Sequence, residues 1–145
     1  MYTVKTLSGA DLLTQALEKA GIEVVFGFPG ESSLALYATL AKSEKISNVV
    51  ARSELCSSFM ADAYARFSQK VTICHAPGGI GSPQLLPGML EAHNSSIPVV
   101  FISFSEPQAQ VGKWSTSTFD HETFQRVIKK TFVVHQASDI PTVVT

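Results

Sequence analysis

Three short segments of this chain carry residue types that could do chemistry: Gly27–Gly30, Arg52–Glu54 and Ala76–Pro83. Each one follows an apolar stretch typical of a buried strand. If those stretches are parallel strands, their carboxyl ends meet at one edge of a sheet, which is where such folds bind ligands. We therefore expect the three segments to line one crevice.

Glu54 is the candidate for proton chemistry. It stands between an apolar stretch and a helix beginning Leu55-Cys56-Ser57, where an ionised carboxylate would be partly desolvated. A carboxyl group in such a place can give a proton to a bound molecule or take one from it. The alternative is that Glu54 merely lies in the first turn of a helix, where an acidic side chain complements the helix dipole. The spacing alone leaves both interpretations open.

Glycines in the first and third segments would let the backbone approach a ligand closely. Gly27 and Gly30 stand on either side of Pro29, and a structural turn explains any one of these residues equally well. The run Gly78-Gly-Ile-Gly81 looks like a phosphate-binding loop. It lacks the GxGxxG spacing and a Walker lysine, however, which argues against a nucleotide site.

Two histidines are candidates for a substrate pocket. His75 is expected at the end of a strand, beside the glycine-rich segment, and His121 lies in a polar stretch from which it could reach a substrate. The alternatives are a structural role for His75 and an exposed loop position for His121. We expect no metal ligands in this chain.

Composition narrows the class of protein. The 145 residues, taken as 1–145, fit one domain, and 45% hydrophobic with 16% charged residues suits a globular chain with buried strands. A net charge of −1 with scattered basic residues argues against nucleic acid as a partner. Cys56 and Cys74 are too few for a disulfide framework, and we expect both to be buried thiols. No apolar run is long enough to cross a bilayer, which favours a soluble, cytoplasmic protein.

The elements that must position these residues alternate between helix and strand. This alternation predicts an α/β fold of three layers, α/β/α, around a mainly parallel central sheet. Ile97–Phe104 is the most apolar strand and is expected at the centre of the sheet, whereas Glu106–Phe124 is expected to be a long surface loop. The predicted elements are a helix from Ser8 to Gly21, a strand Glu23–Gly27, a helix capped by Ser32 and Ser33 through Leu40, a strand Ile46–Ala51, a helix Cys56–Phe67, a strand Val71–Cys74, a helix Gln84–His93, the strand Ile97–Phe104 and a helix start at Ile140-Pro141.

Several motifs then follow one another along nearly the whole chain: Gly9-Ala-Asp-Leu-Leu, Val25-Phe-Gly-Phe-Pro-Gly30, Arg52-Ser-Glu54, Ala61-Asp-Ala-Tyr-Ala-Arg66 and Ser96-Ile-Pro-Val-Val100. In this order they resemble the N-terminal pyrimidine-binding (PYR) domain of thiamine-diphosphate-dependent enzymes of the acetolactate synthase, pyruvate oxidase and 2-oxo acid decarboxylase type. The resemblance is specific for the family and not for one reaction.

The resemblance implies roles for individual residues. Glu54 matches the catalytic glutamate that hydrogen-bonds a ring nitrogen of the cofactor's aminopyrimidine and favours its imino tautomer. Gly27, Pro29 and Gly30 match a cofactor-binding loop that approaches the active centre. Gly79, Gly81 and Gln84 fall where the family has a Gly-Pro-Gly stretch ending in asparagine, so that Gln84 departs from the pattern. Ser53 replaces a usual histidine and His93 a common tyrosine.

The resemblance also implies what else the protein needs. The chain lacks the Gly-Asp-Gly and Asn-Asn motifs with which the family holds magnesium and the diphosphate, so it would bind only the pyrimidine end of thiamine diphosphate. A diphosphate-binding (PP) domain, with its magnesium, is expected on a separate or missing polypeptide, and the isolated chain is expected to be inactive. Its domain would be truncated at the C-terminal helix and strand. FAD is possible but not indicated.

The implied protein is a lyase or transferase that decarboxylates or carboligates a 2-oxo acid. It would form a homodimer or higher oligomer through its third and fourth helices. The alternative is a non-catalytic α/β binding or regulatory module that kept the fold.

Overall fold

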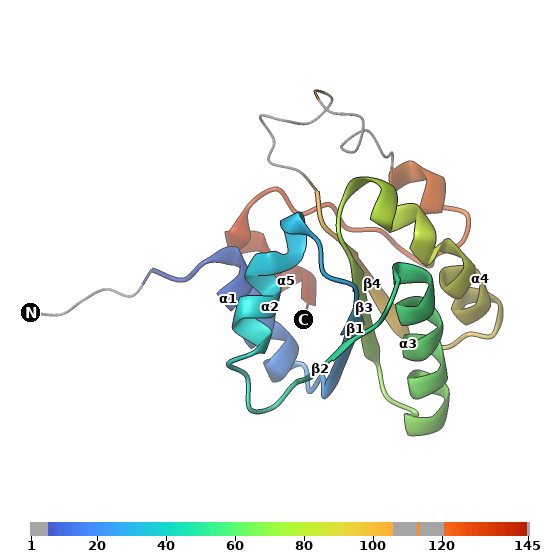
Figure 1. Ribbon diagram of the computed structural model, residues 1–145, viewed down its shortest axis with the longest axis horizontal. Helices are drawn as coiled ribbons and strands as arrows, with labels where there is room; N and C mark the ends of the chain where they lie inside the picture. The colour runs from blue at the N-terminus through green and yellow to red at the C-terminus, as the bar shows by residue number, and fades with distance from the viewer. Residues whose placement is uncertain (1–5, 106–112, 114–120, 145) are drawn as a thin grey trace, which may run out of the picture.

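The structure is a computed structural model that describes residues 6–105, 113 and 121–144, and of residues 121 and 122 only the backbone. Four parallel strands form one sheet, in the order β2 (Ser47–Val50), β1 (Val24–Gly27), β3 (Thr72–Ala76) and β4 (Val99–Ser103). Helices α1 (Gly9–Lys19), α2 (Leu34–Leu40) and α5 (Ile140–Val144) cover one face, and α3 (Glu54–Ser68) and α4 (Leu86–Asn94) cover the other (Figure 1). The predicted α/β fold of three layers with a parallel sheet is confirmed.

The first helix begins and ends where its sequence indicates. The Ser8 hydroxyl accepts a hydrogen bond from the Asp11 amide (3.1 Å), and the Asp11 carboxylate accepts one from the Ser8 amide (2.9 Å), which is a capping box. Gly21 follows the helix with φ +78°, a conformation that favours glycine. These local signals set the two ends of α1.

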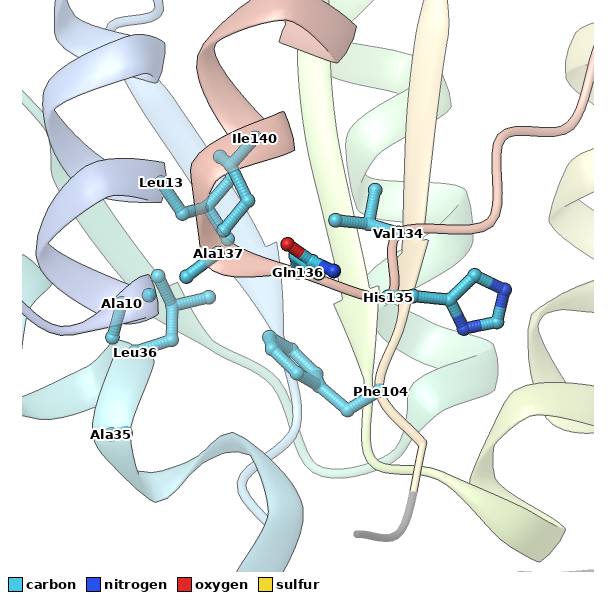
Figure 2. A pocket seen from close by; sticks show the side chains of 11 residues that line it. Ala10, Leu13, Ala35, Leu36, Phe104, Val134, His135, Gln136, Ala137 and Ile140 are labelled. Carbon is cyan, nitrogen blue, oxygen red and sulfur yellow. The ribbon is translucent and has the colours of Figure 1, made fainter. Parts of the chain in front are cut away.

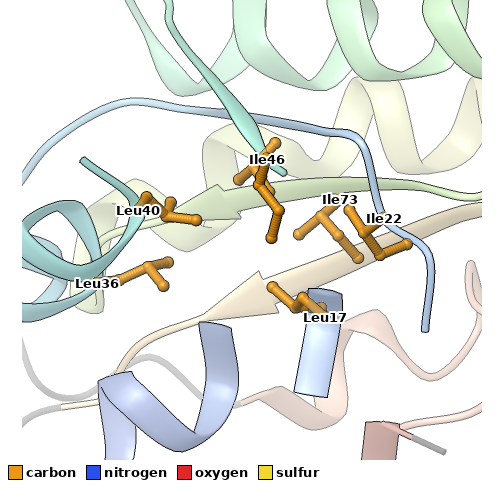
Figure 3. Packing of buried hydrophobic residues seen from close by; sticks show 7 residues of the cluster. Leu17, Ile22, Leu36, Leu40, Ile46 and Ile73 are labelled. Carbon is orange, nitrogen blue, oxygen red and sulfur yellow. The ribbon is translucent and has the colours of Figure 1, made fainter. Parts of the chain in front are cut away.

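Side chains of the strands alternate between two cores. On the α1 and α2 side, the sheet contributes Val25 and Ile73, and on the α3 and α4 side it contributes Phe26 and Cys74. The first core also holds a set of large aliphatic side chains from the helices and loops, packed as Figure 3 shows: Leu17, Ile22, Leu36, Leu40 and Ile46.

Helices α3 and α4 pack closely on each other. A Cβ on Gly88 of α4 would lie 2.3 Å from the hydroxyl oxygen of Ser58 on α3, so the two helices meet without space for a side chain. Arg66 adds ion pairs to Asp62 on its own helix and Glu91 on α4, both at 2.7 Å. The small side chain of Ser58 and the glycine at position 88 thus let α3 and α4 approach closely.

The prediction that Ile97–Phe104 lies at the centre of the sheet was wrong. β4 borders only β3 among the described strands, and Val100 is 47% exposed. All five residues of β3 are buried, because this strand has neighbours on both sides and helices on both faces. An apolar sequence shows that the faces of a strand are covered and does not show how many strands lie beside it.

Ser32 and Ser33 do not cap α2 as predicted. A short 3₁₀ helix, η1 (Glu31–Ser33), precedes α2, and Ser33 makes no side-chain cap. The Ser33 hydroxyl instead bonds the backbone amide and carbonyl of Gly30, both at 3.0 Å. Serine side chains compete for nearby backbone groups in this way, which here tightens the turn after β1.

Two further predictions need correction. Helix α3 begins at Glu54, two residues earlier than predicted, and Cys56 points outward and is exposed, whereas Cys74 is buried as expected. The end of the predicted Glu106–Phe124 loop forms a short 3₁₀ helix, η4 (His121–Phe124), whose Phe124 enters the second core. Most of the rest of that loop lies outside the described residues.

Candidate active site

Glu54 is the first residue of α3 and is almost fully buried, with 6% of its surface exposed. Ser53, in extended conformation, caps the helix by accepting a hydrogen bond from the Cys56 amide (3.2 Å). The Ser57 hydroxyl donates to the Glu54 carbonyl (2.7 Å), but within the described part of the chain the Glu54 carboxylate has no hydrogen bond or ion pair. Because no described group is hydrogen-bonded to it, the carboxylate is available to a bound partner.

Gly81 brings the third segment, Ala76–Pro83, into close contact with this carboxylate. A Cβ at Gly81 would lie 2.9 Å from Oε1 of Glu54 and 2.8 Å from Cγ of Pro77. The segment here is a 3₁₀ helix, η2 (Gly79–Leu85), and it starts with Gly79 at φ +68°, which favours glycine. The predicted neighbourhood of Glu54 and Gly81 is therefore present, and it depends on glycine at the point of contact.

The first and third segments also meet. A Cβ at Gly30 would lie 2.4 Å from the Cβ of Pro77, and the Ser32 hydroxyl accepts a hydrogen bond from the Gly78 amide (3.0 Å). Neither Pro77 nor Ser32 was predicted to join these segments, because contacts between residues some 46 positions apart leave no local signal. The three segments thus come together through direct packing, whereas the crevice between them stays a prediction.

His75 lies in the interior of the protein and not on the surface beside Glu54. It belongs to β3, which runs to Ala76, and its side chain has no exposed surface. Its ring makes edge contacts with Tyr37 (centroids 5.1 Å apart) and Phe104 (6.0 Å). Within the described residues neither ring nitrogen has a hydrogen-bond partner, and burial lowers the pKa of His75 to about 4. Burial likewise raises the pKa of Tyr37 to about 12.

The other predicted site residues are not drawn together. Pro29 is half-buried in the loop after β1, and Gln84 is exposed on η2 with no contact to Glu54 among those described. The backbone of His121 lies in η4, and its side chain is outside the described residues. The structure thus joins Glu54 to the glycines and not to His75.

A separate hollow of about 290 Å³ lies on the other face of the sheet (Figure 2). It is lined mostly by apolar side chains of α1, α2 and the chain near α5, with Phe104 at one wall and Gln136 among the lining residues. The His135 side chain points away from the labelled side chains of α1 and α2. Glu54 and the glycine segments take no part in this hollow.

Large apolar side chains are exposed on the outer layer formed by α3 and α4. Phe67, near the end of α3, is 94% exposed, and others lie along both helices: Leu55, Phe59, Met60 and Leu90, exposed by 37–43%. Exposed apolar surface of this kind is typical of an interaction site. We call these five residues the α3–α4 patch.

Two features are absent from the described residues. No helix there is long and apolar enough to span a membrane. Nor do three or more histidine, cysteine, aspartate or glutamate side chains gather there as they would around a metal ion.

Comparisons with known proteins address the identity of the chain. Residues 7–130 match the family described as "Thiamine pyrophosphate enzyme, N-terminal TPP binding domain". Acetolactate synthase 2, chloroplastic, of Brassica napus is 36% identical over 141 residues, covering 94% of this chain and 22% of that protein. The acetolactate synthase large subunit of Haemophilus influenzae (strain ATCC 51907 / DSM 11121 / KW20 / Rd) is 34% identical over 139 residues, covering 95% and 24%. The chain thus spans about a quarter or less of the length of these relatives.

Proposed function

Because this chain belongs to the thiamine pyrophosphate enzymes, as their N-terminal TPP-binding domain, we propose that it binds the aminopyrimidine end of thiamine diphosphate and that Glu54 activates that ring. The observation that carries the proposal is the Glu54 side chain, which is only 6% exposed and whose carboxylate has no partner within the described residues. A ring nitrogen would supply the missing hydrogen bond.

Glycines let the neighbouring segments pack directly beside Glu54. Gly81 and Gly30 lie where a side chain would collide with Glu54 or Pro77, so the backbone of these segments comes close to the carboxylate. The start of α3 adds the positive end of the helix dipole beside the carboxylate. Glu54 can therefore both exchange a proton with a bound molecule and complement the dipole of α3. A carboxylate that only complemented the dipole would gain nothing from burial.

The cofactor would supply the reactive carbon, and the residues around Glu54 would supply a proton-sharing carboxylate and a dry environment. Thiamine diphosphate, when bound, supplies the carbon nucleophile for reactions of 2-oxo acids. Glu54 shares a proton with the pyrimidine nitrogen, and the packed segments around Gly30 and Gly81 exclude water, which strengthens that hydrogen bond. Gly27, Pro29, Gly79 and Gln84 are proposed to contact the cofactor from the same two segments.

For the whole protein we propose decarboxylation or carboligation of a 2-oxo acid, as in an acetolactate synthase. The diphosphate and magnesium would be held by a PP domain outside this chain, without which the chain would be inactive. The α3–α4 patch would be covered by a second copy of the chain. FAD is not indicated by any residue here, and the cytoplasmic location stays a prediction.

The test is Glu54→Gln in the intact protein that carries this chain. Glutamine keeps the size of the side chain and removes its proton exchange, so thiamine-diphosphate-dependent consumption of 2-oxo acids should fall by about a hundredfold or more. The control is Glu44→Gln, at an exposed position, which should leave the rate unchanged. Equal rates for wild type and Glu54→Gln would favour the alternative, a non-catalytic binding module.

A further inference from the structure

We propose that His75 is a positioning residue for the candidate site. Its imidazole ring sets the place of the Gly27–Gly30 loop and, through the residues packed on that loop, the place of the Glu54 carboxylate. This inference rests on the proposed function, because it concerns the same site.

The His75 ring contacts Gly27 directly. These residues are paired in the parallel ladder between β1 and β3. A Cβ on Gly27 would lie 2.1 Å from Nε2 of His75, 2.4 Å from Cδ2 and 2.5 Å from Cε1. The outer edge of the imidazole therefore rests directly on the backbone of Gly27, where β1 ends and the loop begins.

The His75 ring is enclosed by other side chains. The rings of Tyr37 from α2 and of Phe104 beyond β4 meet it edge-on, with interplanar angles of 73° and 81°. The side chain has no exposed surface. Side chains packed this closely transmit strain instead of absorbing it, so the ring acts as a fixed support under Gly27.

Further packing contacts connect Gly27 to Glu54. The loop that starts at Gly27 brings Gly30 against Pro77, which follows His75 by two residues, just beyond the end of β3. Pro77 packs in turn on Gly81, and Gly81 on the carboxylate of Glu54. A chain of close contacts thus leads from the His75 ring to the carboxylate by way of two loops.

The imidazole ring supports Gly27 through its shape and volume. Within the described residues, both of its nitrogens lack hydrogen-bond partners. An apolar side chain of similar volume should therefore support Gly27 equally well, whereas a small side chain should not. This distinction separates a positioning role from a role in which His75 exchanges protons with a substrate.

The test is amide hydrogen exchange of the intact protein without cofactor, followed in residues 26–33 and 77–82. His75→Ala should raise exchange in these two segments by about tenfold or more, and His75→Met should keep it near the wild-type rate. If His75→Ala does not fold, His75→Val is the milder truncation with the same expectation. Unchanged exchange in the truncated variant would overturn the proposal.

Two further variants make the result specific. Ile73→Ala truncates another buried residue of the same strand and face, and it should not raise exchange selectively in these segments. Gly27→Ala should loosen the loop in the wild-type background and be tolerated together with His75→Ala, because the new methyl group then enters the vacated space. Equal effects of Gly27→Ala in both backgrounds would contradict the contact.

Hydrogen exchange does not depend on the role of Glu54, so the two proposals can fail separately. If Glu54→Gln retains activity while His75→Ala loosens the loops, only the proposed function is lost. Where the protein is active, His75→Ala should also lower kcat by about tenfold through misplacement of Glu54, and His75→Met should restore it. Failure of His75→Met to restore kcat would overturn the positioning role.

Discussion

Gly81 lies so close to Glu54 that a Cβ at this glycine would stand 2.9 Å from the carboxylate oxygen Oε1. The same Cβ would lie 2.8 Å from Cγ of Pro77. The contact joins the beginning of α3 to the loop after β3, and with it two of the three segments that the sequence singles out. It also explains why a residue without a side chain is needed at this place.

Gly81→Ala should therefore damage the site more than the fold. The added methyl group must displace the Glu54 carboxylate or Pro77, so we expect thiamine-diphosphate-dependent activity to fall by about tenfold or more. The free energy of unfolding should fall by about 1–2 kcal/mol, because the loop can shift. Steady-state kinetics and urea denaturation of the intact protein measure the two effects.

Gly9→Ala is the control for that substitution. A Cβ at Gly9 would lie 3.4 Å from Ala137, an ordinary contact, and alanine favours the helix by up to about 1 kcal/mol. This variant should be at least as stable as the wild type and fully active. Full activity of Gly81→Ala would mean that the place of the carboxylate does not matter.

Local signals in the sequence predicted much of the fold. The alternation of strands and helices, the serine before α1 and the glycine after it depend on neighbouring residues, and the structure has them where expected. The meeting of the Glu54 segment with the glycine segments also followed, because parallel strands place their carboxyl ends at one edge.

Contacts between distant residues could not be predicted in this way. The sequence placed His75 at the end of a strand beside the site, but β3 extends through Ala76. Since side chains alternate along a strand and Cys74 faces α3, His75 must face α2. That Gly27 lies beside it depends on the register of β1 and β3, which no local pattern specifies.

Acid should destabilise the protein through His75. Burial lowers the pKa of this imidazole to about 4 in the folded state, whereas an unfolded histidine has a pKa of about 6.5. Between these values the unfolded chain binds the extra proton, so stability falls as the pH drops from about 6.5 towards 4, by a total on the order of 3 kcal/mol. Chemical denaturation at pH 7 and pH 4.5 measures the difference.

His75→Met isolates this contribution from that of the carboxylates. The variant lacks the titrating ring, so its loss of stability between the two pH values should be smaller than that of the wild type. The comparison variant His93→Gln removes an exposed histidine of α4 and should behave as the wild type does. An equal loss in His75→Met and wild type would show that the ring is not the group that titrates.

The α3–α4 patch should mediate self-association. Phe59 and Phe67 are 43% and 94% exposed, and aromatic side chains at the centre of an interface commonly dominate its binding energy. Changing each to serine should weaken self-association by about tenfold or more per ring, seen as a fall in molar mass by light scattering over a dilution series. Leu34→Ser is the control, because Leu34 is 57% exposed on α2, in the opposite layer. A wild-type protein that stays monomeric at high concentration, or a Leu34 variant that dissociates as readily, would count against an interface at this patch.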